Sequence, residues 1–220
     1  MRSFRLFVGT ALLAGLVGQA NALPILRLVS SGGSDVTITD SDADGIVSYS
    51  GALAGWTNVN FTTGFSKPAL GSAQVPFLDI LSANMSSSGG PASLSVYLTD
   101  TDFGPSNEGQ FISAIGGSTQ GSVSYQAFAD ASNAAFGQGT LLSSIVSTTA
   151  PAFSGMASSL WGAVGQYSLT LLVTITHDGG PRFTSLDASL QVPEPSTLLL
   201  LGAGLLALGG VARRRIAAIA

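Results

Sequence analysis

The chain contains no cysteine among its 220 residues. Disulfide bonds, thiol chemistry and thiolate metal ligands are therefore excluded. It has a single histidine, His177, so a zinc site built from the usual nitrogen and sulfur ligands is not expected either. The fold must be held by a hydrophobic core, and a body of about 170 residues is long enough to bury one without covalent links.

Basic residues are scarce away from the two ends. From residue 23 to residue 192 only Arg27, Lys67 and Arg182 are basic, against eleven carboxylates, which gives this segment a net charge of about −8. Nucleic acid binding requires a basic surface that neutralises phosphates, and so does binding to an anionic membrane surface. Nucleic acid is therefore not an expected partner, and the body is not expected to bind anionic lipid.

The apolar runs of the chain lie at its ends. Near the C-terminus, Val192-Pro193-Glu194-Pro195-Ser196 precedes an uncharged stretch over residues 197–212, followed by Arg213, Arg214 and Arg215. Proline disfavours a continuing helix, so a helix should begin after Pro195. Sixteen residues at about 1.5 Å each give roughly 24 Å, a short membrane span. We expect a transmembrane helix at about 197–212, an arginine stop-transfer signal, and a cytoplasmic tail at 216–220.

The N-terminal end has the pattern of a signal peptide. Arg2 and Arg5 precede an apolar stretch over residues 6–17, and Ala20-Asn21-Ala22 supplies a small-x-small cleavage signal. We expect residues 1–22 to be removed after Ala22, so that the chain is exported through the inner membrane. The alternative is an uncleaved N-terminal membrane helix.

The tail resembles the sorting segment of the PEP-CTERM family of exported bacterial proteins. The resemblance rests on the Pro193-Glu194-Pro195 motif, the Leu/Gly/Ala stretch and the arginine cluster, in that order within 192–215. It implies processing near Pro-Glu-Pro by the membrane protease exosortase, and a final location in the cell envelope or extracellular matrix of bacteria that make exopolysaccharide. The same tail is also known as the ice-binding protein C-terminal domain, because some ice binders carry it. The alternative is an ordinary single-span anchor.

Alternating apolar and polar residues predict the fold class. The alternation is clearest over residues 94–99, 169–176 and 186–191, with shorter examples at 36–38, 77–81 and 123–129. A period of two is typical of half-buried strands. Glycine-rich turns are predicted at 31–33, 88–91, 116–118 and 178–181. We therefore predict one all-β domain over residues 23–191, an antiparallel β-sandwich of jelly-roll type, with a helix as the alternative for residues 127–136.

Asp40-Ser41-Asp42-Ala43-Asp44-Gly45 is the sharpest candidate for a ligand site. Carboxylates at Asp40, Asp42 and Asp44 followed by glycine match the first half of an EF-hand-type calcium loop. The second half does not match, because Gly51 stands where a bidentate Glu is expected. The hypothesis of a calcium site competes with that of an acidic, solvated turn between strands.

Asp100, Asp102 and Glu108 are the candidates for hydrolysis of a glycan. Glycosidases need two carboxyl groups at a set separation, one of them in a pocket that raises its pKa. The competing interpretation is that these are surface carboxylates near a strand end. His177 and Asp178 are a poor catalytic pair, because neighbouring residues of a strand point to opposite faces. We therefore expect no catalytic residue and interpret His177 as the end of a strand.

Aromatic side chains offer another kind of contact with sugars. Six amphipathic rings suit glycan faces, with core packing as the alternative: Trp56, Trp161, Tyr49, Tyr97, Tyr125 and Tyr167. The sequence therefore favours a non-enzymatic exported protein without a cofactor, structural or adhesive in an exopolysaccharide matrix. The alternatives are a matrix polysaccharide hydrolase and a calcium-dependent adhesin.

Overall fold

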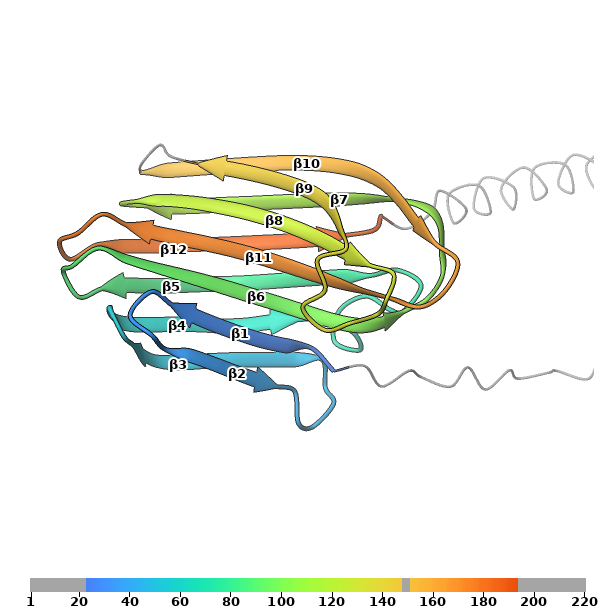
Figure 1. The fold of residues 1–220 in the computed structure, drawn as a ribbon, viewed down its shortest axis with the longest axis horizontal. Coiled ribbons are helices and arrows are strands. Elements are labelled where there is room, and N and C mark those ends of the chain that lie inside the picture. Colours follow the sequence, from blue (N-terminus) through green and yellow to red (C-terminus); the bar gives the residue numbers. More distant parts are fainter. Residues whose placement is uncertain (1–22, 148–150, 194–220) are drawn as a thin grey trace, which may run out of the picture.

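A computed structural model describes residues 23–147 and 151–193, which form twelve strands (Figure 1). The strands are β1 Ile25–Ser30, β2 Asp35–Thr39, β3 Ile46–Leu53, β4 Trp56–Phe65, β5 Phe77–Ser87, β6 Ala92–Phe103, β7 Ser106–Thr119, β8 Ser122–Asp130, β9 Thr140–Ser147, β10 Ala152–Ala163, β11 Tyr167–His177 and β12 Phe183–Gln191. Within the described residues there is no helix that is long and apolar enough to cross a membrane. The predicted signal peptide and transmembrane helix lie outside these residues.

The strands form two six-stranded antiparallel sheets that pack face to face (Figure 1). Sheet A has the order β2-β1-β6-β11-β8-β9, and sheet B has the order β10-β7-β12-β5-β4-β3. Most connections cross from one sheet to the other, so strands that follow each other in the chain tend to face each other across the core. The prediction of an antiparallel β-sandwich is confirmed.

The core lies between the two sheets and is built from the alternating residues. Sheet A contributes Leu94, Val96 and Leu98 from β6 and Leu171 and Val173 from β11, all fully buried. Sheet B contributes Leu78, Ile80, Met85, Leu186 and Leu190 from β5 and β12, which are at most 2% exposed. Burial of each large aliphatic side chain contributes about 1.5–3 kcal/mol. The period of two in the sequence therefore did locate these strands and their inward faces.

The alternative of a helix over residues 127–136 is wrong. Its first half completes β8, and a loop over residues 131–139 follows. Oδ1 of Asp130 accepts a hydrogen bond from the backbone N–H of Ser132 at 2.7 Å, which turns the chain at the strand end. Asn133 and Phe136 both have a φ of 58°, which a right-handed helix does not allow.

This loop packs onto the outer face of sheet A. Oγ of Ser168 donates to the carbonyl of Ala134, and the backbone N–H of Phe136 donates to Oγ1 of Thr99. The loop thereby helps to bury β11, whose first seven residues are buried on both faces. β11 lies between β6 and β8 and is therefore a central strand of sheet A.

The turn predicted at residues 116–118 is also wrong, because these residues lie inside β7. The chain turns instead at residues 120–121. Gly117 is needed for close approach of two backbones: a Cβ built on it would lie 2.1 Å from the carbonyl oxygen of Ser185 on β12. A glycine in a strand interior marks such an approach.

We expect Gly117→Ala to destabilise the protein by about 1–3 kcal/mol, because the strands must separate to admit the methyl group. Gly116→Ala is the matched control, since the nearest atom to its added Cβ would be 3.7 Å away. Urea denaturation of both variants measures the difference. Equal stability of the two variants would contradict the assigned close approach.

Candidate functional site

The predicted processing motif begins where the last strand ends. β12 ends at Gln191, and the backbone N–H of Val192 still donates to the carbonyl of Pro76 at 3.0 Å. Pro193 follows and is half-buried. Glu194, Pro195 and the arginines at 213–215 lie outside the described residues, as do Ala20 and Ala22. Cleavage at the Pro-Glu-Pro motif would therefore leave every described strand intact.

The three carboxylates proposed for calcium lie in the turn between β2 and β3. One oxygen atom from each of Asp40, Asp42 and Asp44 lies within 4.8 Å of the others. Asp40 is buried, and its oxygens accept the backbone N–H groups of Ala43 at 2.9 Å and Gly45 at 2.8 Å. Burial opposes its ionisation, but the hydrogen bonds outweigh it and lower the pKa of Asp40. These bonds account for the turn, and calcium binding there stays a prediction.

Asp100 is not a surface carboxylate, which corrects the interpretation made from the sequence. Its side chain is fully buried, and Oδ2 lies 3.0 Å from Nζ of Lys67. Oγ of Ser66 also donates to this carboxylate, and Nζ of Lys67 donates to the carbonyl of Thr101. Burial raises the pKa of Asp100 and lowers that of Lys67, in each case against the attraction of the partner. The group is a buried ion pair that ties β6 to the segment after β4.

Asp102 has a different hydrogen-bond partner from Asp100. Its backbone N–H donates to Oδ1 of Asn133 at 2.8 Å, and Nδ2 of Asn133 donates back to its carboxylate. Asp102 has a φ of 55°, so β6 is irregular at this point. Asp102 anchors the loop over 131–139, and the side chain of Glu108 is outside the described part of the structure.

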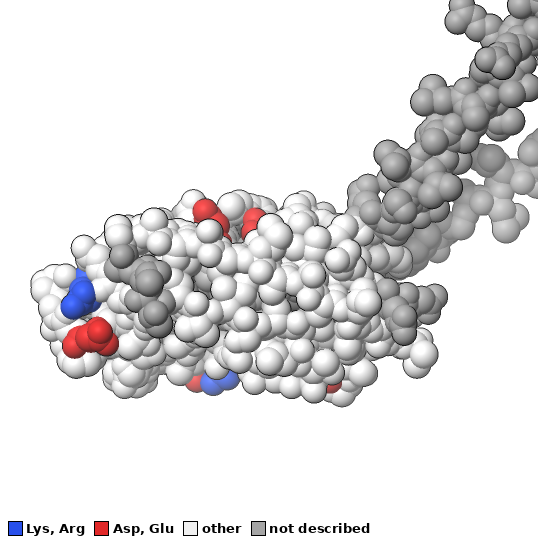
Figure 2. Space-filling model, turned by 90° about the horizontal axis from the view of Figure 1, so that it is seen from above, with Lys and Arg blue, Asp and Glu red and all other residues white. Residues whose placement is uncertain are grey.

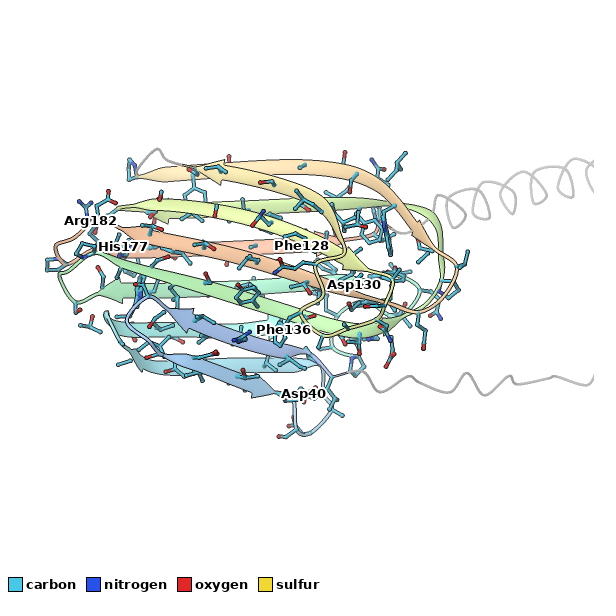
Figure 3. The ribbon with its side chains drawn as sticks, in the orientation of Figure 1. Asp40, Phe128, Asp130, Phe136, His177 and Arg182 are labelled. Carbon is cyan, nitrogen blue, oxygen red and sulfur yellow. The ribbon has the colours of Figure 1, made fainter. Side chains whose placement is uncertain are left out.

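His177 ends β11, as the sequence predicted, but it is fully buried. Nδ1 lies 2.9 Å from Oγ of Ser87, and Nε2 lies 2.8 Å from Oγ1 of Thr184. The ring also packs against that of Trp56, with 4.8 Å between centroids and a tilt of 43°. Figure 3 places His177 at the opposite end of the sandwich from Asp40. Both ring nitrogens therefore have hydroxyl partners, and burial lowers the pKa of His177.

Three of the six aromatic candidates for sugar contact are buried in the core. Trp56, Tyr125 and Tyr167 are at most 2% exposed, so the alternative of core packing holds for these three rings. The others are half-buried: Trp161 packs against Tyr167, Tyr49 donates to the carbonyl of Ala52, and Tyr97 contacts Phe136 on the outer face of sheet A.

The structure adds a groove on the outer face of sheet B that the sequence did not predict. It contains the carboxylates of Asp79 on β5 and Asp187 on β12. Charged side chains are sparse on the face of the body that Figure 2 shows. From the sequence, each of these two residues is simply an outward position of an alternating strand. Only the pairing of β5 with β12 brings the two together.

No curated protein matches the chain. Among solved structures, TmCBM61 in complex with β-1,4-galactotriose matches with a TM-score of 0.36 and 10% identity, over 64% of this chain and 90% of that one. Isomalto-dextranase of Arthrobacter globiformis T6 complexed with panose matches with a TM-score of 0.23 and 14% identity, over 78% of this chain and 30% of that one. Residues 191–215 match the PEP-CTERM protein-sorting motif. The chain therefore carries, directly after its last strand, the sorting signal of an exported PEP-CTERM protein.

Proposed function

We propose that the protein is an exported, non-enzymatic component of an exopolysaccharide matrix, with a structural or adhesive role. The sorting motif at residues 191–215 carries the proposal. In this proposal an exosortase-type protease cuts at Pro193–Pro195, after a short transmembrane helix has held the C-terminus in the cytoplasm. The body is thereby released to the cell surface or matrix.

The body itself supports such a role through its surface chemistry. It has a net charge of about −8 with only three basic residues. Outward positions of the strands include small hydroxylic side chains, among them Ser95 and Thr174 on central strands of sheet A, Ser189 on β12 and Ser154 on the edge strand β10. Hydroxyl groups both donate and accept hydrogen bonds, which suits contact with polysaccharide.

The intact mass of the protein recovered from the surface and medium of its native host tests the proposal. We expect a chain that begins near Leu23 and ends at Pro193–Pro195, with any additional mass reporting attached sugar. Replacing Pro193 and Pro195 with alanine should leave the tail attached, whereas Pro181→Ala, in an exposed turn, should be processed normally. A wild-type chain that still ends at Ala220 would identify an ordinary anchor and refute the proposal.

A further inference from the structure

The groove on the outer face of sheet B has a volume of about 570 Å³ and is lined by residues of four neighbouring strands, β10, β7, β12 and β5. Its floor is formed by Ala114 and Gly116. Alanine has only a methyl group and glycine has no side chain, which leaves room above the sheet. One wall consists of Ser154 and Met156 on the edge strand β10, which pair with Gly116 and Ala114 respectively. Met156 is 76% exposed, so this wall offers an apolar surface to solvent.

The opposite wall carries the two carboxylates. Asp187 and Ser189 on β12 pair with Gly116 and Ala114, and Ser189 pairs in turn with Asp79 on β5. Oδ1 of Asp187 accepts the backbone N–H of Ser82 at 2.6 Å. No described residue donates a hydrogen bond to the carboxylate of Asp79. Burial, and then repulsion by Asp187, raises the pKa of Asp79 to about 6.

The body supplies no cation to offset these charges. Arg27 pairs with Asp35, and Lys67 with Asp100. The third basic residue, Arg182, donates to backbone carbonyls in the turn before β12 and in the turn after β7. Two neighbouring carboxylates in a partly desolvated groove therefore repel each other with no cation of the body beside them.

We propose that this groove binds a polysaccharide that carries free amino groups. Its ammonium groups lie beside Asp79 and Asp187 and form charge-assisted hydrogen bonds with them. The apolar faces of its sugar rings lie over Ala114 and Met156. The choice of a polysaccharide, instead of a basic protein segment, rests on the matrix role proposed above.

Charge complementarity selects this occupant over two others. A neutral glycan can donate hydrogen bonds to Asp79, but it does not offset the repulsion between the two carboxylates. A second copy of the body is equally unsuitable, because its three basic residues are already engaged within the fold.

The test is isothermal titration of the full-length chain in detergent at about pH 6.5 with a glucosamine hexamer and with its N-acetylated counterpart. The two probes share a backbone and differ in charge. We expect binding of the glucosamine hexamer, and Asp79→Asn or Asp187→Asn should weaken it about tenfold or more. Asp178→Asn removes one carboxylate from an exposed turn elsewhere and should leave the affinity unchanged.

Three results would overturn the proposal: equal affinity for the N-acetylated hexamer, an unchanged affinity in Asp79→Asn, or tighter binding of an oligolysine of equal charge. The last result would indicate a basic protein partner. The melting temperature of Asp79→Asn should not fall, because the substitution removes a half-buried charge that has no partner; this controls for misfolding. Absence of any binding of the glucosamine hexamer to the wild type would also overturn this proposal, and normal processing of the tail would then leave the sorting proposal standing.

Discussion

Lys67→Met is expected to lower the free energy of unfolding by about 3–5 kcal/mol, because it leaves the buried carboxylate of Asp100 without its counter-charge. The exposed fractions of the two side chains are 7% and 0%, so water cannot take the place of the ammonium group. Nζ of Lys67 also lies 4.3 Å from the centroid of the Phe103 ring, a cation–π contact that methionine cannot make. Urea denaturation at constant pH measures the loss.

The exposed ion pair of Arg27 with Asp35 provides the matched control. Its side chains are 39% and 48% exposed, and the pair is therefore screened by solvent. Arg27→Met should cost far less than Lys67→Met. In the double variant Lys67→Met/Asp100→Leu, part of the stability should return, since neither charge is then buried alone. If Lys67→Met and Arg27→Met cost the same, the buried pair does not hold β6 in the way described.

His177 is expected to make the protein less stable as the pH falls below about 6.5, the usual pKa of histidine in an unfolded chain. In the folded state its pKa is lowered, first by burial and then by repulsion from Arg182, although Asp178 opposes the shift. The unfolded chain therefore binds a proton that the folded chain does not. Stability is lost from about pH 6.5 down to the folded pKa, by at most about 1.4 kcal/mol per pH unit.

The difference between the wild type and His177→Gln isolates this effect. Glutamine keeps a polar side chain that can form hydrogen bonds, but it does not titrate. The comparison of the two proteins is needed because Asp79 changes the stability in the opposite direction. Its pKa in the folded protein is about 6, above that in the unfolded chain, so the folded state binds the extra proton. Acidification through pH 6 therefore adds stability at Asp79 while it removes stability at His177. Urea denaturation at about pH 7.5 and pH 5 should show a steeper acid loss in the wild type. Parallel pH profiles of the two proteins would contradict a neutral, buried His177.

The strands were predictable where apolar and polar residues alternate over several positions. Residues 94–98 alternate in this way, residues 169–175 do so apart from Leu172, and both segments lie in central strands. The prediction failed at residues 116–118 because glycine signals both a turn and a close approach between strands, and only the position of Ser185 distinguishes them. It failed again over 127–136, where the loop conformation depends on contacts with Thr99 and Ser168 in other strands.

The candidate site was predictable only in its contiguous parts. The sorting motif and the Asp40 turn are each read within a few consecutive residues, and the structure places the three carboxylates of the turn together. Asp100 and Asp79 were not predictable in the same way. Asp100 forms its ion pair with Lys67, which lies 33 positions earlier in the chain. Asp79 lies near Asp187 only because β5 pairs with β12.

The sequence by itself determined the class of the fold and the sorting signal, because both depend on local order: the alternation of side chains along a strand, and a motif followed by an apolar stretch and a basic cluster. Only the tertiary structure decided the state of each ionisable side chain. Burial and the distance to other charges control that state, and here both arise from the pairing of distant strands. Asp100 and His177 thereby became parts of the core, whereas Asp79 was left in an open groove without a partner.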